Sequence, residues 1–110
     1  MIMAHRPIRV GIVGAGFIGQ LAHMANYAKI KDCRIVALAA GRPELRRKVA
    51  ERYGIPRAYS THQELLKDPE VEAVVAVTAR PGIGPVAFDC LKAGRHLLTE
   101  KPMASTLEQA

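Results

Sequence analysis

Tryptophan is absent from this sequence, and other aromatic residues and cysteine are scarce. With three tyrosines and two phenylalanines, the chain offers few platforms on which nucleic-acid bases could stack. Its two cysteines, Cys33 and Cys90, are far apart and lack the spacing of metal ligands. We therefore expect reduced thiols in a cytoplasmic protein, and no metal site.

Long apolar runs are also missing. No run approaches the roughly 20 residues of a membrane-spanning helix, and the first residues lack the apolar core of a secretory signal. We therefore expect no association with a membrane. The 110 residues are 49% hydrophobic, which suffices for one folded domain, residues 1–110, with a modest core.

The net charge of +6 is spread along the chain rather than gathered in a tail. Its densest group is Arg42, Arg46, Arg47 and Lys48, with no aromatic residue among them. A basic nucleic-acid site needs organised charge together with stacking residues, so we expect no nucleic-acid partner. The group is either a solvated helix face or an anion site for a cofactor phosphate.

The most informative motif is a G-x-G-x-x-G pattern formed by Gly14, Gly16 and Gly19. It follows a predicted buried strand, Ile8–Val13, and precedes a predicted helix, Phe17–Ile30. In this setting the first glycine makes a tight turn, the second admits a pyrophosphate and the third lets the helix pack closely. The free N–H groups at the start of the helix attract the phosphates. The alternative is a glycine-rich turn without a ligand.

Strand and helix patterns alternate along the rest of the chain. Further strands are predicted at 34–39 and 72–77, a short extended piece at 56–60, and a last strand at 96–99. Further helices are predicted at 43–53, from Thr61 to Pro69, at 86–93 and, as a beginning only, at 105–110. Residues 80–85, rich in glycine and proline, are predicted as a loop.

Continuous apolar strands separated by helices predict an α/β fold, a doubly wound parallel sheet of the Rossmann dinucleotide-binding type. Ligands of such sheets bind beyond the carboxyl ends of the strands. Those ends are predicted at Gly14–Gly19, Ala40–Arg42, Thr78–Arg80 and Glu100–Pro102. All the unusual residues of the chain fall at these four places, so we expect the ligand there.

The end of the second strand predicts which nicotinamide cofactor binds. An acidic residue about 20 positions after the glycines would accept hydrogen bonds from the ribose of NAD. Here the chain has Gly41 and Arg42 instead, and an arginine pairs with a phosphate. We therefore predict NADP, held at its 2′-phosphate by Arg42 with help from Arg46 or Arg47. The alternative is NAD, with Arg42 as a loop residue.

The tripeptide Glu100-Lys101-Pro102 follows the last predicted strand at its carboxyl end. A lysine there could donate a proton or a hydrogen bond to a substrate oxygen during hydride transfer. We expect Glu100 to orient Lys101, and Pro102 to fix the turn through a cis peptide bond. Taken alone, the tripeptide also fits an ordinary surface turn.

With these motifs the chain resembles the Gfo/Idh/MocA oxidoreductases, which include glucose–fructose oxidoreductase and inositol dehydrogenase. The resemblance covers essentially the whole sequence. It rests on the segments 11–19 (GIVGAGFIG), 50–55 (AERYGI), 66–73 (LKDPEVEA) and 93–104 (AGRHLLTEKPMA). The last of these segments, combined with the early glycine loop, is the most specific part.

The resemblance implies roles for individual residues. Lys101 would be the catalytic or substrate-positioning lysine, beside the cofactor together with Glu100 and Pro102. The pyrophosphate would be lined by Gly14, Gly16, Phe17, Ile18 and Gly19. The loop formed by Thr78, Ala79 and Arg80 would lie against the cofactor ribose. That loop departs from the family pattern, Thr-Pro-Asn followed by a histidine, because Ile83 stands about where the histidine would be. Arg80 either binds an acidic substrate group or points to solvent.

The four histidines do not supply the missing one. None of His5, His23, His62 and His96 has an acidic partner at a convincing spacing, and His5 and His62 are expected on the surface. The larger departure is length. The resemblance implies a further substrate domain, which we do not expect in these 110 residues, and we expect them to end before the last strand of the nucleotide-binding fold.

The sequence therefore predicts the nucleotide-binding part of an NAD(P)-dependent dehydrogenase or reductase. Its parent enzyme would transfer hydride between the nicotinamide and a small carbonyl or hydroxyl compound, such as a sugar or cyclitol. The isolated chain is expected to be inactive, and to form a homo-oligomer or to require the missing C-terminal domain. The alternative function is a non-enzymatic NADP(H)-binding module, or a subunit that needs a partner chain.

Overall fold

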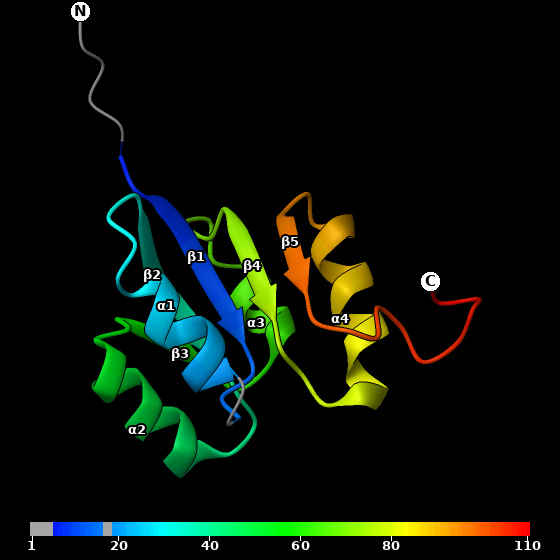
Figure 1. The fold of residues 1–110 in the computed structure, drawn as a ribbon, viewed down its shortest axis with the longest axis horizontal. Helices are drawn as coiled ribbons and strands as arrows, with labels where there is room; N and C mark the ends of the chain where they lie inside the picture. The colour runs from blue at the N-terminus through cyan, green and yellow to red at the C-terminus, as the bar shows by residue number, and fades with distance from the viewer. Residues whose placement is uncertain (1–5, 17–18) are drawn as a thin grey trace, which may run out of the picture.

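The computed structural model describes residues 6–16 and 19–110 (Figure 1). These residues form an all-parallel sheet of five strands in the order β3-β2-β1-β4-β5. The strands are β1 (Ile8–Val13), β2 (Cys33–Ala39), β3 (Arg57–Tyr59), β4 (Ala73–Ala76) and β5 (His96–Thr99). The strand order reverses between β1 and β4, which confirms the predicted doubly wound sheet.

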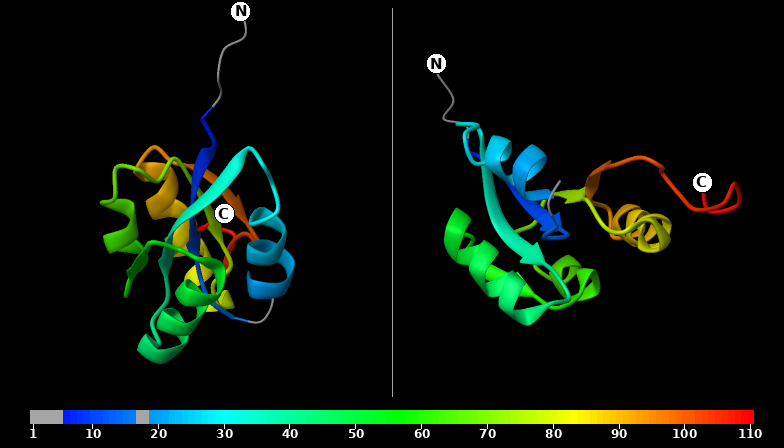
Figure 2. Two further views of the ribbon diagram at one scale, coloured as in Figure 1. Left: turned by 90° about the vertical axis from the view of Figure 1, so that its left-hand side faces the viewer. Right: turned by 60° about the horizontal axis from the view of Figure 1, so that its bottom comes forward.

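Helices cover both faces of this sheet (Figures 1 and 2). They are η1 (Gly19–Met24, a π-helical segment), α1 (Ala25–Tyr27), α2 (Pro43–Tyr53), α3 (His62–Leu66) and α4 (Arg80–Lys92). On one face Met24 of η1 and Val49 of α2 pack in a cluster with Val10, Ile12 and Leu38. The other face of the sheet is covered by α3 and α4.

The second core cluster joins α3 and α4 to the sheet. Leu65 of α3 and Cys90 of α4 are completely buried there with Val74 of β4. Burial raises the pKa of the Cys90 thiol to about 11, so this thiol stays protonated at neutral pH. Because strands buried on both faces need apolar residues throughout, their sequences read as continuous runs.

Several local signals in the sequence are confirmed. Helix α2 begins at Pro43. Proline has no backbone N–H, and an N–H at this first helical position would have no partner within the helix. The helix is followed by Gly54, whose φ is 64°. Helix α3 is capped by Thr61, whose hydroxyl accepts a hydrogen bond from the Glu64 amide at 3.2 Å. These caps place the two helices directly after β2 and β3.

The predicted loop at 80–85 is wrong, because these residues form the first turns of α4. Pro81 is tolerated in the first turn, whereas Pro85 lies inside the helix and removes one backbone hydrogen bond. The helix forms because Ile83, Val86 and Cys90 are buried on one side at helical spacing. That spacing was the signal in the sequence, and the prolines and glycines obscured it.

Two other predicted helices differ in extent. The helix expected over 17–30 ends at Tyr27, and its first residues, Phe17 and Ile18, lie outside the described residues. The helix expected to begin at 105–110 is a turn instead. Leu107 is 92% exposed there, so no packing stabilises so short a helix. Figure 1 shows this segment running past α4, away from the sheet.

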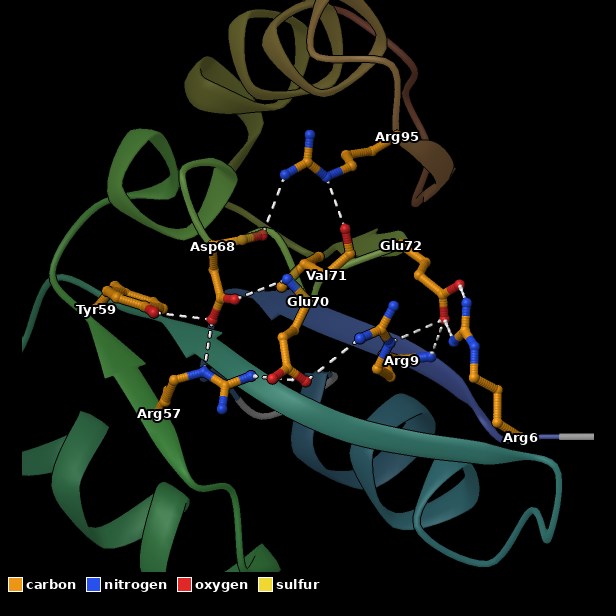
Figure 3. A network of polar contacts seen from close by, with 9 residues as sticks. All are labelled: Arg6, Arg9, Arg57, Tyr59, Asp68, Glu70, Val71, Glu72 and Arg95. Carbon is orange, nitrogen blue, oxygen red and sulfur yellow. Dashed lines mark hydrogen bonds and ion pairs between the residues drawn. The ribbon is translucent and has the colours of Figure 1, made fainter.

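A polar network holds the amino-terminal edge of the sheet, opposite the predicted ligand edge (Figure 3). Asp68 is buried and accepts hydrogen bonds from Arg57 Nε at 2.6 Å and from the Tyr59 hydroxyl at 2.8 Å. Glu72 accepts two hydrogen bonds from Arg6 and one from the Arg9 amide. The network therefore joins the residues that begin β1, β3 and β4.

Candidate functional site

The carboxyl ends of the three inner strands are held level with one another by backbone hydrogen bonds. The Gly14 amide donates to the Ala39 carbonyl and the Val77 amide to the Val13 carbonyl, both at 2.8 Å. These bonds continue the parallel pairing one residue beyond β1 and β4. The loops after β1, β2 and β4 consequently leave the sheet side by side, as the sequence predicted.

A groove of about 560 Å³ lies along this edge. Among the predicted site residues, those that line it are Gly14, Gly16, Gly41, Arg42, Thr78 and Ala79. None of the described residues that line the groove is acidic. Its volume falls in the usual range for small-molecule sites, and Arg42 is the one formally charged side chain, apart from a histidine, among the described residues that line it.

The two glycines of the loop after β1 have different steric surroundings. Gly14 has φ +111°, and a Cβ there would lie 2.5 Å from the Val77 carbonyl oxygen. A Cβ on Gly16 would meet no atom of the described residues within 4 Å. Gly14 is thus required by the fold itself, whereas Gly16 borders open space that a phosphate group can approach.

Thr78, which lines the groove, carries a polar atom without a partner among the described residues. Its Oγ1 is buried and has no hydrogen-bond partner within the described part of the chain. Burying a hydroxyl without a partner is costly, so such an atom calls for an explanation such as a ligand. The cradle at Gly16 and this hydroxyl both fit a cofactor with phosphate and ribose oxygens.

The three arginines predicted to act together are separated. Arg42 lies at the start of α2, lines the groove, and makes no hydrogen bond or ion pair with its side chain to the described residues. Arg46 donates to the Ala40 carbonyl at 2.7 Å and so holds the loop in place. Arg47 pairs with Glu44 and Glu51 and does not line the groove. Only Arg42 is available there.

The tripeptide 100–102 follows β5, one strand beyond the groove, and does not line it. Lys101 is exposed and is joined to Pro102 by a cis peptide bond, as expected. Glu100 accepts a hydrogen bond from His23 Nε2 at 2.9 Å, a contact that the sequence analysis did not foresee. This hydrogen bond is the main cause of a Glu100 pKa below its usual value.

The expectation that no histidine has an acidic partner is therefore wrong. His62, which was expected on the surface, has a side chain only 15% exposed, with Nε2 2.7 Å from Asp89 Oδ2. The pairs His23–Glu100 and His62–Asp89 join residues that are 77 and 27 positions apart in the sequence, so spacing along the chain could not reveal them.

The end of β3 also reaches the groove, as the fourth strand end among the described residues that line it. Ser60, Thr61, His62 and Gln63, which follow β3, line it opposite the glycine loop. The Ala40 amide donates to the Tyr59 carbonyl at 3.1 Å and holds this end beside that of β2. The extended piece predicted at 56–60 was the sequence signal for these lining residues. If that piece joins the parallel sheet, its end lies at the same edge as the other strand ends.

Some predicted features lie beyond what the structure describes. Phe17 and Ile18 fall outside the described residues, and for Gly19 and Arg80 only the backbone is described. Among the described residues, no three histidine, cysteine or acidic side chains form a metal-binding group. No helix within the same residues is long and apolar enough to cross a membrane.

The chain is similar to known dehydrogenases. It is 32% identical to a myo-inositol 2-dehydrogenase of Thermotoga maritima over 91% of this chain and 30% of that protein. A solved scyllo-inositol dehydrogenase of Lactobacillus casei, with bound NAD(H) and scyllo-inositol, has a TM-score of 0.88 at 25% identity, covering 94% of this chain and 31% of its own.

A third relative carries the other cofactor. A 3-ketoreductase from Actinomadura kijaniata, solved with TDP-benzene and NADP, has a TM-score of 0.86 at 26% identity, covering 94% of this chain and 33% of its own. The chain thus spans about a third of the length of these relatives.

The family described as an oxidoreductase family with an NAD-binding Rossmann fold matches residues 8–110. This chain belongs to that family, the Gfo/Idh/MocA oxidoreductases.

Proposed function

We propose that this chain is the cofactor-binding part of an oxidoreductase that acts on a small carbonyl or hydroxyl compound, of the sugar or cyclitol kind, and that it prefers NADP. The observation that carries this proposal is a groove with an open glycine cradle, an unpaired arginine and no acidic side chain among its described residues. When bound, the nicotinamide supplies or accepts the hydride.

The preference for NADP rests on Arg42. Arg42 lines the groove, its guanidinium has no partner among the described residues, and a phosphate is a ligand with which an arginine pairs strongly. An acidic residue at the end of β2 would hold the ribose of NAD instead, and Ala39, Ala40 and Gly41 occupy that end. The loop itself is held by Arg46, which leaves Arg42 to bind the ligand.

Lys101 is the proposed catalytic residue. It follows β5 at the carboxyl edge of the sheet, beyond the groove, on the side where β4 and β5 pair. Its ammonium group would donate a hydrogen bond or a proton to the substrate oxygen, in which case a small substrate binds between this lysine and the cofactor. Because the chain spans about a third of its relatives, we expect little turnover by the chain alone.

A titration of the purified chain with NADPH and NADH, followed by nicotinamide fluorescence, tests the cofactor preference. In Arg42→Gln, the affinity for NADPH should fall by about 10- to 100-fold, because one charge-assisted contact contributes about 1.5–3 kcal/mol. The affinity for NADH should change by less than about threefold. The matched control is Arg47→Gln, which removes the same charge from the same helix outside the groove.

Equal losses in Arg42→Gln and Arg47→Gln would mean that only the overall charge matters, and would contradict the assignment. Tighter binding of NADH than of NADPH by the unaltered chain would contradict the preference for NADP. Binding of neither cofactor would contradict the proposed site.

A non-enzymatic NADP(H)-binding module, or a subunit that acts with a partner chain, is the second candidate. Exposed apolar side chains favour it: Phe88 and Leu91 on α4 are each 62% exposed, and Leu98 on β5 is 46% exposed. Sedimentation of the chain at increasing concentration tests this candidate. A monomer throughout would argue against association with a second copy.

A further inference from the structure

The contact between His23 and Glu100 joins the two parts of the proposed site that are farthest apart in sequence. His23 lies in η1, which follows the glycine loop, and Glu100 immediately precedes Lys101. The two side chains meet at 2.9 Å between Nε2 and Oε2, with the His23 side chain only 15% exposed. The His23 ring also stacks on Tyr27, at 6.3 Å between centroids, which limits its orientation.

The chemistry of this pair fixes which group donates. The Glu100 pKa is lowered, so the carboxylate is ionised at neutral pH and can only accept hydrogen bonds. Nε2 of His23 must therefore carry the hydrogen, in the neutral as well as the charged ring. Glu100 immediately precedes Lys101, so this hydrogen bond joins η1 to the turn that carries the lysine.

The backbone before this point is anchored independently. The Glu100 amide donates to the Ala76 carbonyl at 3.3 Å, which ties residue 100 to the end of β4. Beyond it the chain leaves the sheet, and Lys101 and Met103 are exposed. The contact of the Glu100 side chain with His23 is thus a second anchor at the start of the Lys101 turn, besides this backbone bond.

We propose that His23 is a positioning residue: by holding the Glu100 carboxylate, it fixes the turn that carries Lys101 against the helix that follows the glycine loop. A cofactor that binds at the glycine loop then acts on the position of Lys101 through this contact. The inference rests on the proposed function of the site, in which Lys101 faces the substrate.

Amide hydrogen exchange of the full chain, without cofactor, tests the contact directly. In His23→Phe, which keeps an aromatic ring beside Tyr27 but cannot donate, exchange at the Glu100 amide, which donates to the Ala76 carbonyl, should be faster by about tenfold. Exchange at Ile12 in β1 should be unchanged. In His23→Gln, whose side chain can still donate from an amide, slow exchange at Glu100 should return. Asp89→Ala is the matched control, because it breaks the other histidine–carboxylate pair, with His62.

Unchanged exchange at the Glu100 amide in His23→Phe would overturn the proposal. Exchange that speeds up equally at Ile12 would also overturn it, because the contact would then stabilise the whole domain rather than the turn. The same acceleration at Glu100 in Asp89→Ala would show that the effect is not specific, with the same consequence.

Coupling to the cofactor is read from NADPH titrations of chains with ¹³C-methylated lysines, in which the Lys101 signal is identified by its loss in Lys101→Arg. NADPH should shift this signal in the unaltered chain, and the shift should fall by at least half in His23→Phe at saturating NADPH. An equal shift in both would overturn the coupling. If NADPH does not bind the unaltered chain, the proposed function fails, while the exchange experiment still decides whether His23 positions the turn.

Discussion

Single residues at the carboxyl edge of the sheet separate what the fold needs from what the ligand needs. Gly14 adopts a positive φ, and its α-carbon lies against the backbone after β4, so a side chain there collides with the protein itself. Around Gly16 no atom of the described residues lies within 4 Å of an added Cβ, so a side chain there would intrude on a bound phosphate. The sequence motif contains both glycines but does not distinguish these two roles.

This difference predicts opposite effects for the two alanine substitutions. Gly14→Ala should lower the free energy of unfolding by about 2 kcal/mol or more, because of backbone strain and the overlap with Val77. Gly16→Ala should change it by less than about 1 kcal/mol while abolishing NADPH binding. Urea denaturation and a fluorescence titration measure the two quantities. Retention of NADPH affinity in Gly16→Ala would contradict the cradle.

At the scale of elements, the sequence predicted four of the five strands and their shared edge, because β-branched runs and helix caps are local signals, and it predicted the region of β3 only as a short extended piece. It failed where tertiary packing overrides local preference. Helix α4 contains Pro85 and was predicted to begin only at Val86, yet buried Ile83 lies in its first turns. It also missed the pair between His23 and Glu100, which only the folded chain brings together.

If burial rather than propensity forms the first turns of α4, removing Pro85 should stabilise the protein. Pro85→Ala restores a backbone donor inside the helix. It also makes the unfolded chain more flexible, which opposes part of this gain. On balance we expect the free energy of unfolding to rise by about 1–2 kcal/mol. Pro81→Ala is the control, because a first-turn proline removes no helical hydrogen bond. Thermal unfolding of both variants measures the difference. A destabilised Pro85→Ala chain would contradict this account.

At the scale of the whole molecule, a polar network that stabilises the fold and the groove proposed to bind the cofactor lie at opposite edges of the sheet. The amino-terminal edge carries the network around Asp68 and Glu72 (Figure 3), and the carboxyl edge carries the groove. Hydrogen bonds from Arg6 and from the Arg9 amide lower the Glu72 pKa from 4.5 to about 2. Burial raises the Asp68 pKa, but hydrogen bonds from Arg57, the Glu70 amide and Tyr59 outweigh burial and leave it lowered.

These lowered pKa values predict sensitivity to acid. Because the folded state favours the ionised Glu72, the stability that this group contributes is complete above about pH 4.5 and is lost as the pH falls toward 2. The free energy of unfolding, measured by urea denaturation, should therefore fall over this range, and fall less in Glu72→Gln. Glu108→Gln, in the exposed C-terminal segment, should behave like the unaltered chain. An identical pH profile in Glu72→Gln would contradict the role of the network.

The central claim is that the groove at the carboxyl edge binds the cofactor. The most direct test is a titration of the ¹⁵N-labelled chain with NADPH, followed by the backbone amide signals. We predict the largest changes at Gly14, Gly16, Gly41, Arg42 and Thr78, which border the groove, and little change at Asp68 and Glu70 on the opposite edge. Changes centred on the Asp68 network, or no saturable change at any amide, would contradict the account.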